Sequence, residues 1–313
     1  MASILTRPSA RFITGAALVG SAGALIYATR RPYVLDAAQN APSKTLSFPK
    51  NMPFSRQITV TEVEQINHDT KRITFALPGG SNEVSGVAPG GALLTQHSPP
   101  GRFFPVFRPY TPVHDLDERG ILQLVVKKYP NGLASGHLHS LQPGDELTVR
   151  GPIPSYNWKP SPSPRHLLLV AGGAGITPMF SLVQGILNNP QDQTSMQLVW
   201  GVNSTRDIVL KNELENLEER FRDRLRVTYV VSGPEAAPDA PSLGDPEKFK
   251  KGYIDKVVLQ KAIDSAGDKE NWGDTQGTKV FFCGPPAMQE AVAGKNGVLI
   301  NDLGIAKKAV HVF

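Results

Sequence analysis

Cysteine is nearly absent from this chain, since Cys283 is the one thiol among 313 residues. A single cysteine cannot form an internal disulfide, a four-cysteine zinc site or a four-cysteine iron–sulfur cluster. The signatures G-x-S-x-G and H-E-x-x-H are also missing, so the sequence does not support a serine hydrolase or metalloprotease of those kinds. His137 and His139 have no cysteine or carboxylate beside them, and we expect no metal site.

Net charge is missing from the body of the chain, although the isoelectric point is about 9.2. The first 50 residues hold six of the 33 basic residues and one of the 28 acidic ones, which leaves 27 of each sign in the remaining 263. A nucleic-acid-binding domain ordinarily concentrates basic residues on one face. We therefore predict no nucleic-acid partner, and the positive excess belongs to the N-terminal segment.

Long apolar runs are scarce, and residues 12–28 are the stretch that bears on a membrane. These 17 uncharged positions, rich in Gly and Ala, would form a helix about 25 Å long, slightly less than the ~30 Å hydrocarbon core. Two arginines and no acid precede the run. We expect a targeting segment at 1–11, a transmembrane anchor at 12–28 and a proline-containing linker at 29–54. A cleaved secretory signal and a soluble helix are the alternatives.

The rest of the chain shows two different sequence patterns, one after the other. Residues 55–160 contain short β-branched runs separated by Gly and Pro, which predicts a small antiparallel β-barrel. Residues 165–313 alternate strand-like and helix-like segments, including an expected helix at 207–221, which predicts an α/β domain with a parallel sheet covered on both faces. The expected strands are QITVTEVEQI, RITFAL, ILQLVVKKY and DELTVRG, followed by HLLLVAG, MQLVWGV, RVTYVVS and KVFFCG.

The first motif is RPYTP, residues 108–112. Its prolines favour extended backbone, which sends Arg108 and Tyr110 to one side and Thr111 to the other. A fixed arginine can bind a phosphate through two hydrogen bonds, and a tyrosine can pack on a ring system. An edge strand with a surface arginine is the simpler alternative.

The second motif is VVKKYPNGLASGHL, residues 125–138, in which a strand ends at a Pro-Asn-Gly turn. Ser135 then lies near an expected helix start, where free N–H groups and a hydroxyl can bind an anion. A hairpin turn followed by a capped helix would have the same sequence.

Two further motifs follow expected parallel strands. LLLVAGGAGITPM (167–179) places glycines between a strand and a helix, so that the backbone can approach a ligand at a helix N-terminus. FFCGPPAM (281–288) ends another strand, and ligands bind at the carboxyl edge of such sheets. Taken alone, Cys283 is as well explained by a small buried apolar side chain.

The combination RPYTP, KKYPNG-x-x-S, GG-x-GITPM and CGPPxM, in this order, resembles the NADH–cytochrome b5 reductase family within the ferredoxin–NADP reductase superfamily. The resemblance spans about residues 55–313 and is nearest to the mitochondrial, membrane-anchored branch. It implies an FAD-binding β-barrel domain followed by an NADH-binding α/β domain. NADH would give hydride to FAD, and single electrons would pass to a haem protein such as cytochrome b5.

The resemblance also implies roles for individual residues. Thr111 and Cys283 would lie at the reacting rings as catalytic residues, and Asp207 would disfavour NADPH because a carboxylate repels its 2′-phosphate. The FAD residues would be Arg108, Pro109, Tyr110, Thr111, Val125, Lys127, Tyr129, Gly132, Ser135 and Thr177. The NADH residues would be Gly173, Gly175, Asp207, Gly284, Pro285 and Met288, together with Cys283.

Two other functions fit the same motifs. One is a mitochondrial flavoprotein that assists haem attachment to cytochrome c. The other is an FAD-binding module with weakened NADH use, because Ala174 stands where the family usually has threonine. We expect the chain to be a monomer, attached to the outer membrane or to the intermembrane-space side of the inner mitochondrial membrane by its N-terminal helix.

Overall fold

The computed structural model describes residues 41–153, 155–163, 165–236, 243–266 and 278–313. The expected targeting segment, the anchor at 12–28 and residues 29–40 of the expected linker lie outside the described residues. Within the described part of the chain, no helix combines the length and apolar character that a membrane crossing requires.

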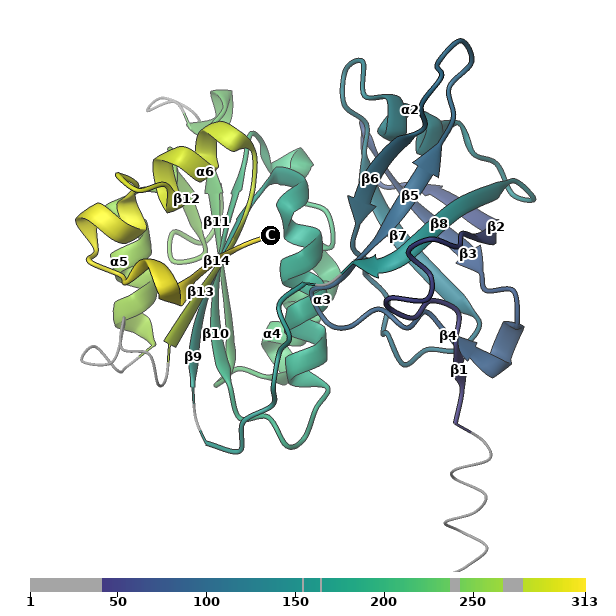
Figure 1. Cartoon of the computed structure of the whole chain (residues 1–313). Helices are drawn as coiled ribbons and strands as arrows, with labels where there is room; N and C mark the ends of the chain where they lie inside the picture. Colours follow the sequence, from purple (N-terminus) through teal and green to yellow (C-terminus); the bar gives the residue numbers. More distant parts are fainter. Residues whose placement is uncertain (1–40, 154, 164, 237–242, 267–277) are drawn as a thin grey trace, which may run out of the picture. The chain divides into compact units, whose positions relative to one another are not determined.

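Residues 56–153 form a six-stranded antiparallel sheet in the order β6-β5-β8-β2-β3-β7, and β1 pairs with β4 in a separate two-stranded sheet (Figure 1). Alternating apolar side chains bury one face around Phe75, Leu124 and Leu147, each fully buried. The sequence predicts a β-barrel. Since the order of strands ends at β6 and β7, we describe this domain more coarsely, as an antiparallel sheet. The strands are β1 (Ser43–Lys44), β2 (Arg56–Gln65), β3 (Thr70–Ala76), β4 (Glu83–Val84), β5 (Ala92–His97), β6 (Val106–Tyr110), β7 (Ile121–Lys127) and β8 (Glu146–Ile153).

Residues 165–313 form a six-stranded parallel sheet in the order β12-β11-β10-β9-β13-β14. Its central strand, β9, is a continuous apolar run, which is typical of a strand buried on both faces. The prediction of an antiparallel domain followed by a parallel α/β domain is confirmed. The strands are β9 (His166–Gly172), β10 (Ser195–Val202), β11 (Leu225–Val231), β12 (Phe249–Lys251), β13 (Thr278–Cys283) and β14 (Val310–Val312).

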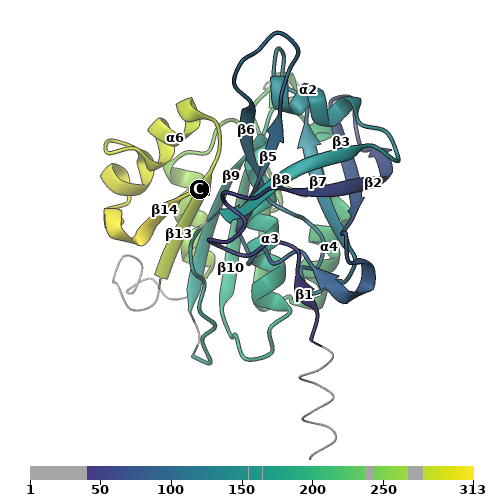
Figure 2. The same cartoon turned by 45° about the vertical axis from the view of Figure 1, so that its right-hand side comes forward.

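Helices cover both faces of the parallel sheet (Figures 1 and 2). The helices α3 and α4 pack on one face around Trp200, and α5 and α6 pack on the other around Phe282. The helices are α2 (Leu133–Ser140), α3 (Ile176–Leu187), α4 (Lys211–Arg220), α5 (Lys256–Ser265) and α6 (Pro286–Ala293). Short helical turns are η1 (Gly80–Asn82), η2 (Gly173–Gly175), η3 (Thr205–Asp207), η4 (Pro234–Ala236), η6 (Val298–Asp302) and η7 (Lys307–Ala309).

The single helix expected at 207–221 is wrong. Asp207 ends the short turn η3, and α4 begins only at Lys211. Leu210 separates the two with a left-handed backbone, φ 56°, which a continuous right-handed helix cannot contain. Asp207 is thereby held by its own turn, where its carboxylate and the Ser204 side chain form a capping box.

Candidate cofactor site between the two domains

The RPYTP motif forms most of β6. Its register with β5 pairs Arg108 with Thr95 and Tyr110 with Leu93, so the arginine and the tyrosine share a face, as predicted. The Thr95 hydroxyl donates to the Arg108 carbonyl oxygen over 3.1 Å, which fixes the backbone there. The Arg108 side chain is exposed, and its Nη1 donates to the Phe107 carbonyl oxygen at 2.7 Å. Thr111, directly after the strand, is buried.

The turn after β7 is built around the Ser135 hydroxyl. This buried hydroxyl accepts from the Tyr129 N–H at 3.2 Å and donates to the Gly132 carbonyl oxygen at 3.2 Å. Gly132 is the N-cap residue of α2, and a Cβ there would lie 2.4 Å from the same hydroxyl oxygen. Only glycine fits this position. The cap residue also has no side chain to cover the first N–H groups of α2, so they can bind a ligand.

Tyr110 and Tyr129 lie close enough to influence each other's ionisation. Burial raises the pKa of Tyr110 to about 12, and the Tyr129 side chain adds to this while Arg108 opposes it. The pKa of Tyr129 is raised mainly by burial, and among the smaller contributions is the Cys283 thiol. The two tyrosines of the antiparallel domain thus stand near the end of β13, and both are neutral hydrogen-bonding groups at physiological pH.

The two glycine-containing motifs meet at the carboxyl edge of the parallel sheet, as predicted. β13 pairs with β9 so that Cys283 lies opposite Ala171, and the loops that follow both strands touch. A Cβ on Gly175 would lie 2.1 Å from the Cys283 carbonyl oxygen, and one on Gly172 would lie 2.4 Å from the Met288 sulfur. The absence of side chains at these glycines is what allows the two loops to pack directly.

The thiol of Cys283 is held in its neutral form. Burial raises its pKa to about 11, because an apolar environment disfavours the thiolate. A protonated thiol is a small, polarisable packing group and a poor nucleophile. A thiol held in this form does not support covalent chemistry on its sulfur.

A pocket joins the two domains and collects five of the predicted residues. The antiparallel domain contributes Val125 and Lys127, and the parallel domain contributes Gly173, Thr177 and Asp207. Four lining residues were not predicted as site residues: Thr70, Ala174, Ile176 and Val209. The remaining predicted residues do not line it. Arg108, Pro109, Tyr110, Thr111, Tyr129, Gly132 and Ser135 belong to the antiparallel domain, and Gly175, Cys283, Gly284, Pro285 and Met288 to the edge of the parallel sheet.

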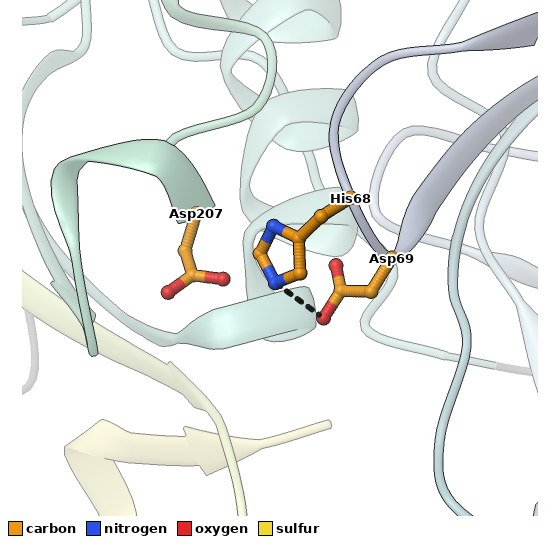
Figure 3. Close-up of side chains that lie close together, drawn as sticks. All are labelled: His68, Asp69 and Asp207. Carbon is orange, nitrogen blue, oxygen red and sulfur yellow. Dashed lines mark ion pairs between the residues drawn. The ribbon is translucent and has the colours of Figure 1, made fainter.

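A charged cluster adjoins this pocket, which Lys127 and Asp207 line. Figure 3 shows Asp207 and Asp69 of this cluster together with His68. The Lys127 Nζ lies 2.9 Å from Asp69 Oδ2 and 3.0 Å from Asp207 Oδ1. Burial alone would raise the pKa of Asp207, but the hydrogen bond and charge of Lys127 and the hydrogen bonds from Ser204 lower it overall. Burial would lower the pKa of Lys127, yet its hydrogen bonds to Asp69 and Asp207 raise it overall. Lys127 and Asp207 are therefore both charged at physiological pH.

His68, Asp69 and Asp207 place possible metal-ligand atoms within 4.8 Å of one another. The Lys127 ammonium group already binds both carboxylates of this group at hydrogen-bond distance. A metal ion would have to displace that cation, so we interpret the cluster as an ion-pair network.

Two more polar contacts join the turn before β3, and β3 itself, to the segment 205–213. The Asn67 amide Nδ2 donates to the Arg206 carbonyl oxygen at 2.8 Å, and Arg72 forms an ion pair with Glu213. The sequence analysis missed Asn67, Asp69 and Arg72. Their spacing carries no motif, because Asn67 and Arg72 reach Arg206 and Glu213 on the other domain, and Asp69 reaches Lys127 only where β3 pairs with β7. The one available signal was the polar turn NHDT between two expected strands.

His114, directly after the RPYTP motif, is buried and predicts an acid-sensitive fold. Its Nδ1 accepts from the Gln123 N–H at 3.2 Å, and its Nε2 has no hydrogen-bond partner. Burial lowers its pKa to about 4, against a smaller opposing effect of Asp115. Above pH 6.5 the imidazole is neutral in both states. As the pH falls toward 4 the unfolded chain binds the proton first, so we expect about 3 kcal/mol of stability to be lost.

The measurement is urea unfolding between pH 7.5 and pH 4 for the wild-type chain and His114→Asn. Asparagine keeps an acceptor for the Gln123 N–H and does not titrate in this range. We expect the wild-type free energy of unfolding to fall more steeply with decreasing pH than that of the variant. Parallel curves for the two proteins would contradict this assignment.

Comparison with known proteins agrees with this division of the chain. Residues 57–158 match the family model of the oxidoreductase FAD-binding domain, and residues 169–294 match that of the oxidoreductase NAD-binding domain. The chain is 42% identical over 268 residues to NADH-cytochrome b5 reductase 2 of Chaetomium globosum, covering 82% of this chain and 71% of the relative. It is 39% identical over 265 residues to the protein of the same name from Botryotinia fuckeliana, with the same two coverages.

Solved structures give the same result. The cytochrome b5 reductase domain of Ulva prolifera nitrate reductase superposes with a TM-score of 0.71 at 26% identity, covering 87% of this chain and all of that one. The CS-b5R domains of human Ncb5or, in the NAD+ form, superpose with a TM-score of 0.64 at 25% identity, covering 83% of this chain and 69% of that one.

Proposed function

This chain belongs to the NADH–cytochrome b5 reductase family, and we propose that it is an FAD-dependent oxidoreductase that takes electrons from NADH and delivers them singly to a haem protein such as cytochrome b5. The observation that carries this proposal is the pocket in which Val125 and Lys127 of the antiparallel domain face Gly173 and Thr177 of the parallel domain. Hydride transfer requires two ring systems in contact, and this pocket marks the junction at which groups held by the two domains can meet.

The antiparallel domain fits FAD. Arg108 presents an exposed guanidinium group on the same face as Tyr110, and the Gly132 turn leaves the first N–H groups of α2 accessible. These groups suit a pyrophosphate, because arginine and a helix N-terminus both bind phosphate oxygens. The face of Tyr110 or Tyr129 suits packing along a flavin. When bound, FAD supplies the acceptance of a hydride and the release of electrons one at a time.

The parallel domain fits a nicotinamide nucleotide. Its glycine loop and the Gly284–Pro285 segment lie side by side where two adjacent parallel strands end, which is the usual ligand edge of such sheets. We propose that Gly173, Gly175, Gly284, Pro285 and Met288 shape this side, that Cys283 contacts the nicotinamide as a neutral thiol, and that Asp207 opposes the additional phosphate of NADPH.

The residues of the chain act here by position and charge. Thr111 is buried beside the strand that carries Arg108, so its hydroxyl can stay fixed toward a flavin nitrogen. Cys283 stays protonated, so that no thiolate charge lies next to the hydride donor. The buried glycine loop and Val125 exclude water from the reacting groups.

The test is direct. The purified chain should carry a yellow chromophore with flavin absorbance near 450 nm, about one equivalent per chain, which bleaches on anaerobic addition of NADH and returns when an oxidised soluble cytochrome b5 is added. A colourless protein that cannot be reconstituted with FAD would disprove the proposal. Flavin that NADH does not bleach would favour the module with weakened NADH use, for which Ala174 is the reason. Reduction of free haem in place of cytochrome b5 would favour the haem-attachment role.

We propose further that the chain is a monomer attached to a mitochondrial membrane, on the outer membrane or the intermembrane-space side of the inner one. The support is the arginine-flanked apolar run at 12–28, which suits import and anchoring. Carbonate extraction of purified mitochondria tests the attachment, since an anchored chain stays in the pellet. Light scattering of the detergent-solubilised chain tests the monomer.

A further inference from the structure

Asp207 cannot act as an isolated negative charge, because its carboxylate is fully engaged. Oδ1 accepts from Lys127 Nζ at 3.0 Å, and Oδ2 accepts from the backbone N–H of Ser204 at 3.0 Å and from its hydroxyl at 3.1 Å. Its side chain is 11% exposed. An aspartate paired with a lysine forms a neutral unit, which repels an approaching phosphate only weakly.

Asp69 changes this balance. It holds the same ammonium group from the antiparallel domain, with Oδ2 at 2.9 Å from Lys127 Nζ, and its Oδ1 accepts from the Thr70 hydroxyl at 2.9 Å. One lysine shared between two aspartates leaves the cluster with a net charge of −1. His68 Nε2 lies 3.5 Å from Asp69 Oδ2, but His68 and Arg206 are both exposed to solvent, which screens any charge that they carry.

We propose that Asp69 is a specificity-determining residue for the pyridine nucleotide, which acts by keeping the Lys127–Asp207 unit negative. This deepens the proposed function and rests on it. The antiparallel domain would therefore hold FAD and also contribute a charge that helps the parallel domain to distinguish NADH from NADPH. A 2′-phosphate carries nearly two negative charges, so a net change of one charge in the cluster alters NADPH binding more than NADH binding.

Two variants that break the same ion pair give opposite results under this proposal. In Asp69→Asn the cluster becomes neutral, and in Lys127→Met it becomes doubly negative. The preference for NAD+ is the dissociation constant of NADP+ divided by that of NAD+. We expect this ratio to fall about fivefold in Asp69→Asn and to rise in Lys127→Met. A purely structural role for the Asp69–Lys127 contact would move the ratio in one direction, or not at all, in both variants.

The experiment uses the full chain in detergent with its FAD, at about pH 8.5 where an imidazole is uncharged, and measures NAD+ and NADP+ affinities by titration calorimetry. Asp117→Asn is the matched control, because Asp117 is exposed on the β6–β7 loop and the substitution removes the same charge. Flavin content of each variant reports its folding. The difference between wild type and Asp69→Asn should shrink as salt increases from about 0.02 M to about 0.5 M.

The outcomes separate this proposal from the proposed function. Equal ratios in wild type and Asp69→Asn, or binding of neither nucleotide, would overturn the specificity role of Asp69. Binding of NAD+ without bleaching of the flavin by NADH would overturn the proposed reaction, while the ratio would still decide the role of Asp69.

Discussion

Replacing Arg108 with alanine is expected to weaken FAD binding by roughly 10- to 100-fold, which corresponds to the loss of one or two charge-assisted hydrogen bonds to phosphate. Arg108 stands on β6 with its backbone held by Thr95, so its position does not depend on a ligand. The side chain is exposed and outside both hydrophobic cores. The substitution should therefore leave the fold intact and release FAD.

The measurement is the dissociation constant of FAD from the apoprotein, followed by quenching of flavin fluorescence. Arg102→Ala is the control, because Arg102 is an exposed arginine on the neighbouring β5–β6 loop and its side chain faces no predicted FAD group. The control should bind FAD as the wild type does. Equal affinities in all three proteins would show that the pyrophosphate lies elsewhere.

Local patterns were sufficient for the two glycine-containing motifs. A buried apolar strand, a glycine turn and a helix start are contiguous in sequence, and parallel strands necessarily end at one edge of their sheet. The strand–loop–helix order at 167–187 and at 279–293 was therefore predictable, and the contact of Gly175 with Cys283 follows from the pairing of β9 with β13.

Other elements required the tertiary structure. β5, with the sequence ALLTQH between glycines and prolines, has too little alternation to stand out, although pairing with β6 and β8 makes it a strand. The left-handed Leu210 that interrupts the expected helix at 207–221 has no sequence signal, because leucine rarely adopts that conformation. Asp69 meets Lys127 only through the pairing of β3 with β7, and Asp207 joins them from the other domain, so no spacing rule connects the three residues.

The last prediction concerns Gly175, where space and not backbone conformation requires glycine. Its φ of −62° and ψ of −4° suit any residue, so the conformation itself carries no strain. A Cβ would nevertheless lie 2.1 Å from the carbonyl oxygen and 2.6 Å from the carbonyl carbon of Cys283. Backbone atoms of a central strand cannot move aside as a flexible side chain can. Gly175→Ala should therefore separate the two loops and destabilise the chain by roughly 3 kcal/mol.

Gly173→Ala is the contrasting variant in the same loop. Gly173 has φ 52°, and no atom lies within 4 Å of the position that its Cβ would take. Alanine there costs only the left-handed conformation, about 1 kcal/mol. Urea unfolding should rank the proteins as wild type, Gly173→Ala and Gly175→Ala in decreasing stability. Because the predicted FAD residues other than Thr177 lie on the other domain, Gly175→Ala should keep its yellow colour and lose at least about tenfold of its rate of bleaching by NADH. An unchanged bleaching rate would mean that the contact between the two loops does not position the nucleotide.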